Sequence, residues 1–158
     1  MAALTTAELD RSSIDDVFSS LPFIANLPDG WGLAARFANS IVVQQAGIGG
    51  TRTMTVSSLK MSQPNVSISE LSRTLLTGQS SLSGITIEGE KMLSISSFIA
   101  YGIRAKVISK GQTLQFRQIV MDLDDYFAVA TVSAPAGDAD AMLAEDLRLL
   151  VTSLRSRL

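Results

Sequence analysis

The sequence predicts one α+β domain in which helices pack against a largely antiparallel β-sheet. Three observations predict it. Apolar stripes of helical period lie near the start, in the middle and at the end of the chain. Strand-like segments lie between them, and the links of the later strands are too short for crossovers, so those strands must be antiparallel. The 158 residues, 46% hydrophobic and 18% charged, suffice for one such domain, which we expect to span 1–158 with a flexible start over 1–12.

The first elements follow from a helical stripe and a turn motif. The stripe of the first helix consists of Ile14, Val17, Phe18 and Leu21. Pro22 ends this helix, and Phe23–Leu27 then has the composition of a strand. The sequence Pro-Asp-Gly before Trp31 is typical of a type I or type II turn.

Two further strands and a capped helix complete the first half. Ile41–Ala46 and Thr51–Leu59 are rich in β-branched residues, and the glycine-rich link between them is interpreted as a β–β turn, not a phosphate-binding loop, because a strand follows it. Ser67 and Glu70 form a capping box, which predicts a helix from Ser67 to Leu82 with Gly78 as an earlier place to end. Its apolar stripe consists of Ile68, Leu71, Leu75 and Leu82.

The second half predicts an antiparallel meander and a closing helix. The strand-like runs are Ile85–Glu90, Ile99–Val107, Gln112–Met121 and Tyr126–Val132. The sequence Ser-Lys-Gly-Gln at 109–112 is interpreted as the hairpin connection between the second run and the third. In the second run Arg104 and Lys106 alternate with apolar residues and point to the other face. The alternation slips at Ile119–Val120, which indicates a bulge or burial on both faces. The last run is apolar or small on both faces, as in a central strand.

The closing helix has the longest apolar stripe. Asp138 is the expected N-cap, and the stripe runs for four turns to the last residue. Its members are Leu143, Leu147, Leu150, Val151, Leu154 and Leu158.

Composition excludes several classes of function. The chain has no histidine and no cysteine, which removes Ser–His and Cys nucleophiles, Cys/His zinc sites and disulfides, so we expect no catalytic residue, no metal and no cofactor. A net charge of −2 without basic runs argues against nucleic acid. We find no secretory signal and no apolar run long enough to span a membrane, and we expect a soluble, cytoplasmic protein.

Three features have a functional interpretation as well as a structural one. Glu88 and Glu90 lie two apart on a strand, so that both carboxylates face one side; a solvated strand face is preferred over an acid–base pair. Met121–Asp125 offers three carboxylates to a cation, but the segment is interpreted as a hairpin turn. Trp31 is interpreted as a cover over the end of the core, with a partner contact as the alternative.

The order of these motifs resembles the PsbP-like group, which includes the PsbP, DcrB and LpqN families and a Ran-binding nuclear transport factor. The resemblance rests on Leu-Pro-Asp-Gly-Trp at 27–31, on Leu93–Ala100 and on Ala134-Pro135 before the last helix, and covers residues 14–158. LpqN-type proteins are the most similar, but their signal and lipidated cysteine are missing here, and Ser97 replaces a glycine of the hairpin motif. The resemblance implies an α/β/α sandwich with a twisted sheet of about six to seven strands and three helices.

The function expected from these observations is a non-catalytic one. The leading hypothesis is a bacterial protein-interaction or accessory (chaperone-type) factor that acts through one face of the sheet, because the scaffold has no plausible catalytic set. The alternative is a carrier that holds an apolar small molecule between sheet and helix. A third, an enzyme using Glu88 and Glu90, is disfavoured. We expect a protein partner. A homodimer is a further alternative, in which the apolar stripe of the closing helix is wider than one sheet can cover and packs against a second copy.

Overall fold

The computed structural model describes residues 18, 20–46, 51–60, 67–79, 85–109, 111–123, 126–135 and 140–156. The elements in these ranges are β1 (Phe23–Ile24), β2 (Gly32–Arg36), β3 (Ser40–Ala46), β4 (Thr51–Lys60), α2 (Ile68–Gln79), β5 (Ile85–Ile95), β6 (Phe98–Ser109), β7 (Gln112–Asp122), β8 (Tyr126–Pro135), α3 (Asp140–Thr152) and β9 (Arg155–Ser156). Neither described helix is long and apolar enough to cross a membrane.

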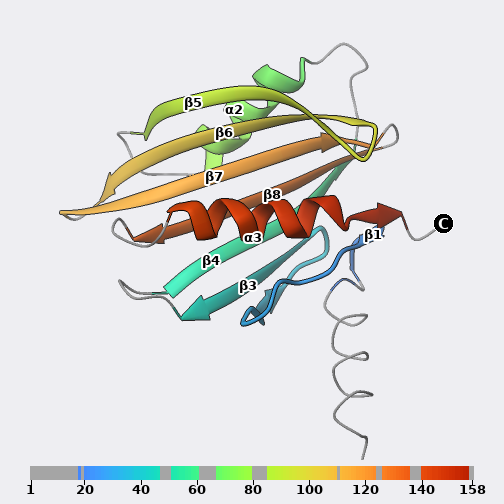
Figure 1. The fold of residues 1–158 in the computed structure, drawn as a ribbon, viewed down its shortest axis with the longest axis horizontal. Helices are drawn as coiled ribbons and strands as arrows, with labels where there is room; N and C mark the ends of the chain where they lie inside the picture. Colours follow the sequence, from blue (N-terminus) through green and yellow to red (C-terminus); the bar gives the residue numbers. More distant parts are fainter. Residues whose placement is uncertain are drawn as a thin grey trace, which may run out of the picture.

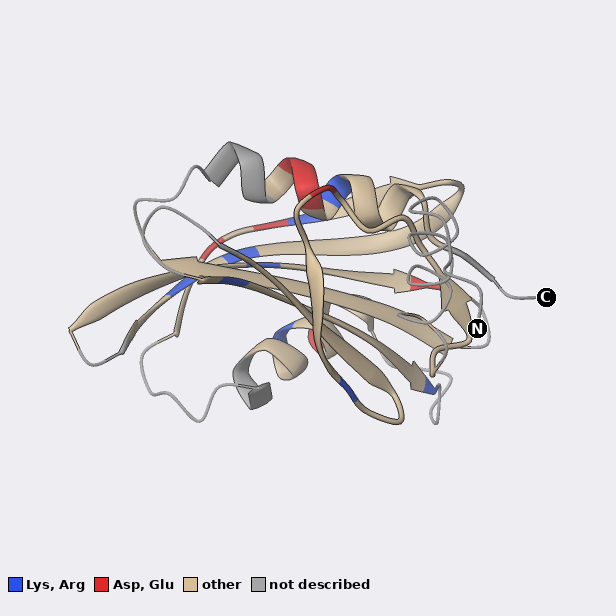
Figure 2. Cartoon of the chain, turned by 90° about the horizontal axis from the view of Figure 1, so that it is seen from below, with Lys and Arg blue, Asp and Glu red and all other residues tan. Residues whose placement is uncertain are grey.

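Seven strands form one antiparallel sheet in the order β2-β3-β4-β8-β7-β6-β5, with β8 in the centre as predicted (Figure 1). The two helices lie on opposite faces of this sheet (Figure 2). The predicted α+β class and the sheet of about six to seven strands are therefore confirmed. The structure describes two of the three expected helices, because the N-terminal one over 14–21 falls, apart from Phe18, Ser20 and Leu21, outside the described residues.

The larger core lies between the sheet and α3. Leu147, Leu150 and Val151 point from α3 onto the sheet, as the predicted stripe requires. Phe23 and Tyr126 extend this core with stacked rings whose centroids are 6.0 Å apart. The buried strand residues of this core include Ile41, Val43, Met54, Val56, Ala100, Met121, Ala128, Ala130 and Val132.

Helix α2 covers part of the opposite face and is tied to it by a buried polar network. Gln118 of β7 donates a hydrogen bond of 2.8 Å from its Nε2 to the carbonyl oxygen of Ser72 in α2. Thr131 of β8 donates from its Oγ1 to Gln118 Oε1 over 3.3 Å. The amide of Gln118 is thus bonded through both its nitrogen and its oxygen, as a buried side chain requires. The predicted helix is confirmed over Ile68–Gln79, and the rest of the predicted range, to Leu82, lies outside the described residues.

The Leu-Pro-Asp-Gly-Trp segment is a turn that rests on the sheet. The backbone N–H of Trp31 donates to the carbonyl of Pro28, and Gly30 has a φ of 88°, which selects a type II turn. A Cβ on Gly30 would lie 2.6 Å from Nε2 of Gln45 in β3. That same Nε2 donates to the carbonyl of Asp29 over 3.1 Å, so glycine is required both by the turn and by its contact with β3.

The prediction of a strand at Phe23–Leu27 is wrong in the length of the strand and in the sheet to which it belongs. Only Phe23 and Ile24 form a strand, and β1 pairs with β9 outside the main sheet. The edge strand of the main sheet is instead β2, Gly32–Arg36, which the sequence analysis missed. Its sequence, Gly-Leu-Ala-Ala-Arg, lacks the β-branched residues that identify most strands.

The closing helix is shorter than predicted. α3 ends at Thr152, and the chain then forms β9, so the helix does not continue to Leu158, which lies with Asp138 outside the described residues. The hydroxyl of Ser153, the first residue after the helix, donates to the carbonyl of Leu150 and accepts the backbone N–H of Asn26, which ties this point of the chain to the N-terminal segment. Leu154 stays buried although it is no longer helical.

The slip of alternation at Ile119–Val120 reflects burial on both faces. The register of β7 with β6 and with β8 runs through these residues without a shift. Val120 packs on the α2 side and Ile119 on the α3 side. Ile99, by contrast, is 57% exposed, so the inward face predicted for Ile99–Val107 begins only at Tyr101.

The hairpin between β5 and β6 turns at Ser96 and Ser97, whose φ values are 50° and 72°. A residue with a side chain loses about 1–2 kcal/mol of conformational free energy in this left-handed region, whereas glycine adopts it without that loss. We expect Ser97→Gly to raise the free energy of unfolding by about 1 kcal/mol, measured by urea denaturation. Ser94→Gly, inside β5, is the matched control and should lower it by about 0.5–1 kcal/mol; equal losses in both variants would contradict the turn geometry.

Candidate functional site

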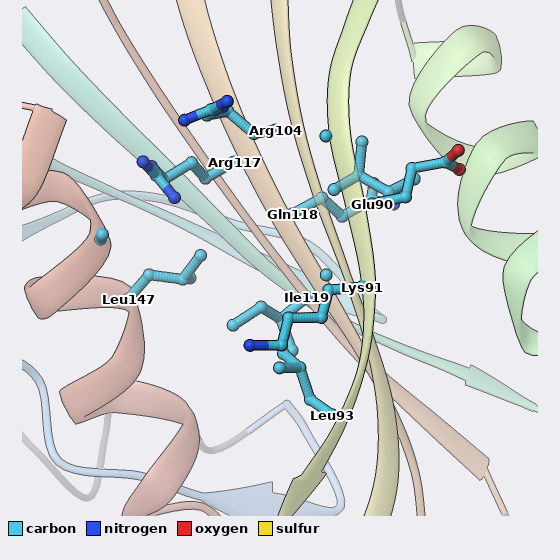
Figure 3. A pocket seen from close by; sticks show the side chains of 12 residues that line it. Glu90, Lys91, Leu93, Arg104, Arg117, Gln118, Ile119 and Leu147 are labelled. Atoms are coloured by element: carbon cyan, nitrogen blue, oxygen red, sulfur yellow. The ribbon is translucent and has the colours of Figure 1, made fainter.

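A hollow of about 350 Å³ lies on the α3 side of the sheet, over strands β5, β6 and β7 (Figure 3). Leu147 and Ala144 of α3 form one wall. Leu93 of β5 and Ile119 of β7 contribute the apolar surface of the sheet. α3 packs mainly over β7 and β8, so this part of the sheet face stays open.

Three basic side chains line the same hollow. Arg104 of β6 lies directly opposite Arg117 of β7 in the sheet register. Lys91 of β5 lies opposite Gly102, one row further along the strands. Figure 3 shows all three side chains on the side of the sheet that faces α3. We call Lys91, Arg104 and Arg117 the cationic cluster.

Two glycines leave the space beside the cationic cluster. Gly89 pairs with Arg104 across the strands, and a Cβ there would meet the Arg104 guanidinium at 3.8 Å. A Cβ on Gly102 would lie 3.2 Å from Leu93 Cδ1, so a larger residue would push Leu93 from its place. The hollow therefore depends on Gly102, where a side chain would crowd Leu93, whereas a Cβ on Gly89 would make only an ordinary contact.

The two glutamates singled out in the sequence are separated by a β-bulge, because the register of β5 shifts between Ile87 and Gly89. Glu88 lies 3.7 Å from Nζ of Lys106. Glu90 accepts a hydrogen bond of 2.5 Å from Nε of Arg73 in α2, and Figure 3 shows its carboxylate turned away from the cationic cluster. The hydrogen bond from Arg73 lowers the pKa of Glu90. The structure thus gives the two carboxylates different partners and does not bring them together as an acid–base pair.

The other sequence candidates that the structure describes, Asp122 and Trp31, do not line the hollow. Asp122 ends β7, while Asp124 and Asp125 of the predicted turn lie outside the described residues. Among the described residues, no group of three or more His, Cys, Asp or Glu is placed to hold a metal ion. Trp31 is 7% exposed, belongs to the core beneath α3 and donates from Nε1 to Asp146 Oδ2 over 3.1 Å.

The cationic cluster was missed by the sequence analysis, which noted only that Arg104 and Lys106 point to the face opposite the apolar residues of their strand. A signal was nevertheless present. Arg104 and Arg117 lie equally far from the predicted turn at 109–112, so a tight hairpin there places them opposite each other. The third member, Lys91, could not be placed in this way because it depends on the pairing of β5 with β6.

Comparison with known proteins identifies the fold. No protein-family model matches the sequence, and no curated protein is similar to it in sequence. Among solved structures, the Saccharomyces cerevisiae Ran-binding protein Mog1p is similar with a TM-score of 0.66 at 12% identity, over 85% of this chain and 90% of that one.

Two further structures belong to the families that the sequence motifs resemble. Cyanobacterial PsbP from Synechocystis sp. PCC 6803 has a TM-score of 0.57 at 9% identity, over 85% of this chain and 86% of that one. LpqN of Mycobacterium tuberculosis, described as involved in cell envelope biogenesis, has a TM-score of 0.52 at 16% identity, over 84% and 81%. The fold is therefore PsbP-like and LpqN-like, as the resemblance implied.

Proposed function

We propose that the chain is a non-catalytic protein-interaction factor of the accessory or chaperone type, and that it engages its partner at the hollow on the α3 side. The fold is shared with Mog1p, which is a Ran-binding protein, and this supports a protein partner. The ion pairs of Glu88 with Lys106 and of Glu90 with Arg73 support a role without acid–base chemistry.

The observation that carries this proposal is the composition of the hollow. It joins apolar side chains, Leu93 and Leu147, to two arginines on a part of the sheet that α3 leaves open. Arginine is enriched in protein interfaces, and it is one of the residues, with tryptophan and tyrosine, that most often carry the binding energy in well-packed pockets. A hollow with both is suited to take an anchor from a partner.

A second candidate is a carrier for an apolar small molecule between sheet and helix. The volume of about 350 Å³ favours it, because small-molecule sites occupy about 300–1,000 Å³. In this case the apolar wall formed by Leu93, Ile119 and Leu147 would hold the ligand.

Native mass spectrometry of the protein purified from its source organism separates the two. A co-purifying polypeptide that is lost in Gly102→Val supports the interaction factor, because Gly102 lines the hollow and the added side chain would occupy space there and crowd Leu93. A retained small ligand that is lost in the same variant supports the carrier instead. A partner that is retained in Gly102→Val, with the variant folded by circular dichroism, would contradict the assignment to the hollow.

Three expectations from the sequence stay predictions. They are a partner contact by Trp31, a homodimer and a cytoplasmic location. The burial of Trp31 beneath α3 means that such a contact would require the N-terminal turn to move.

A further inference from the structure

Strand β5 forms one edge of the seven-stranded sheet, and its outer side pairs with no described strand (Figure 1). The register of β5 with β6 shifts once, between Ile87 and Gly89, and then runs without interruption to the turn at Ser96 and Ser97. The stretch from Gly89 to Ile95 is therefore a regular strand with a β-bulge at one end and a hairpin turn at the other. We call residues 89–95 the edge segment.

The opposite edge of the sheet, β2, is less suited to pair with another strand. It has five residues, and its register with β3 is interrupted between Leu33 and Ala35. Proteins protect edge strands from pairing by shortness, by bulges and by charged side chains. The edge segment of β5 contains no bulge, and its two charged residues, Glu90 and Lys91, are consecutive and so lie on opposite faces.

The centre of the edge segment is an exposed apolar residue. Met92 is 54% exposed and lies opposite Tyr101 of β6. The next residue of β6 on that face towards the turn is Ile99, which is 57% exposed. On α3, by contrast, the stripe residue Leu150 is fully buried against the sheet. The apolar surface beside an unpaired edge indicates a contact with another strand.

The backbone of the edge segment points its unpaired groups outward at three positions. Ile95 and Phe98 flank the two-residue turn and so form a hydrogen-bonded pair. Hydrogen-bonded and non-hydrogen-bonded pairs alternate along an antiparallel ladder. The N–H and C=O groups of Ser94, Met92 and Glu90 therefore point away from β6.

We propose that the edge segment pairs with the edge segment of a second copy of this chain, antiparallel and about a two-fold axis at Met92. Interfaces between identical chains are most often two-fold and self-complementary. Met92 is the central residue, so this register uses the whole segment. It places the outward backbone groups of Met92 against those of Met92 in the second copy, and those of Glu90 against those of Ser94. All outward groups of the segment then have hydrogen-bond partners.

The side chains are compatible with the same register. Glu90 lies opposite Ser94 of the second copy, and Lys91 lies opposite Leu93, so no charged residue faces a like charge. A two-fold axis at Glu90 or at Lys91 would oppose each of these charges to itself, which is unfavourable. The two Met92 side chains cover one another on the face where each is exposed in the single chain.

The pairing also brings the second copy to the hollow. Gly89 lines the hollow, and the register places Ile95 of the second copy opposite it, so that this side chain lies at the β5 rim. α3 packs mainly over β7 and β8 and leaves the β5 edge accessible. The inference does not rest on the proposed function, because a dimer forms at this edge whether or not the hollow binds a partner.

Sedimentation velocity of the full chain over about a hundredfold range of concentration tests the proposal, and we expect a monomer–dimer equilibrium. Met92→Lys places two lysines opposite each other and removes the contact between the two Met92 side chains. We expect the dimer dissociation constant to rise at least about tenfold. Ile108→Lys is the matched control, because Ile108 is 63% exposed but lies on β6 beyond the residues that pair with β5. It should leave the equilibrium unchanged.

A second pair of variants tests the register. Met92→Glu alone should associate as weakly as Met92→Lys, whereas an equimolar mixture of the two should restore the dimer, because position 92 faces itself across the axis. Circular dichroism verifies that each variant is folded. A chain that stays monomeric at all concentrations, a dimer that persists in Met92→Lys, or equal losses in Met92→Lys and Ile108→Lys would overturn the inference. A mixture that associates no better than either variant alone would overturn the axis at Met92.

Discussion

The substitution Trp31→Ala is expected to lower the free energy of unfolding by about 3–5 kcal/mol. The indole is 7% exposed and packs in the core beneath α3, so truncation loses its buried area and leaves a cavity. It also removes the hydrogen bond from Nε1 to Asp146 that ties the N-terminal turn to α3. Chemical denaturation followed by circular dichroism measures the loss without relying on tryptophan fluorescence.

Phe37→Ala is the matched control for this substitution. Phe37 is also a large aromatic residue near the β2 edge, but it is 58% exposed, and its truncation should change stability by less than about 0.5 kcal/mol. A loss in Trp31→Ala no larger than in Phe37→Ala would show that Trp31 is not part of the core in solution. The interpretation of Trp31 as a partner contact would then be favoured.

The substitution Leu150→Ala is expected to cost about 2–5 kcal/mol of stability, because Leu150 is fully buried between α3 and the sheet. Such a loss is a large part of the stability of a domain of this size, which is about 5–15 kcal/mol. The midpoint of urea unfolding should fall without a change in its slope if the fold is otherwise kept.

Leu149→Ala tests the same helix on its other side. Leu149 neighbours Leu150 in the chain but is 42% exposed, and alanine has the higher helix propensity, so the expected loss is less than about 1 kcal/mol. Equal losses at the two positions would contradict the orientation of α3, and with it the position of the hollow beside Leu147.

Much of the fold could be predicted because its elements carry periodic signals. The strands from Ile41 to Lys60, the meander and α2 all combine a hydrophobic period with turn or cap residues. The short strands could not be predicted, for physical reasons. β2 has no β-branched residue, and β1 and β9 have two residues each and exist only because they pair with one another.

The end of α3 shows where periodicity misleads. Leu154 keeps the phase of the apolar stripe and is buried, yet the helix has already ended at Thr152. After the helix, the hydroxyl of Ser153 bonds to the backbone of Asn26, and β9 pairs with β1; both partners are far away in the sequence. A contact of that kind cannot be read from the local pattern.

The site could be predicted in part. The predicted hairpin at 109–112 already implies that Arg104 and Arg117 oppose each other, whereas Lys91 and Gly102 join them only through the register of β5. The hollow itself depends on how far α3 reaches across the sheet, and the stripe of α3 does not encode that distance. Sequence periodicity therefore identifies the faces of the elements but not the open space between them.

The most direct test of the central claim is a map of backbone amide chemical shifts in the isotope-labelled chain on addition of the natural partner. The account predicts shifts at Lys91, Gly102, Arg104, Arg117 and Ile119, with little change in β3. Shifts confined to the amides of β3 and β4, with the amides around the hollow unchanged, would contradict it.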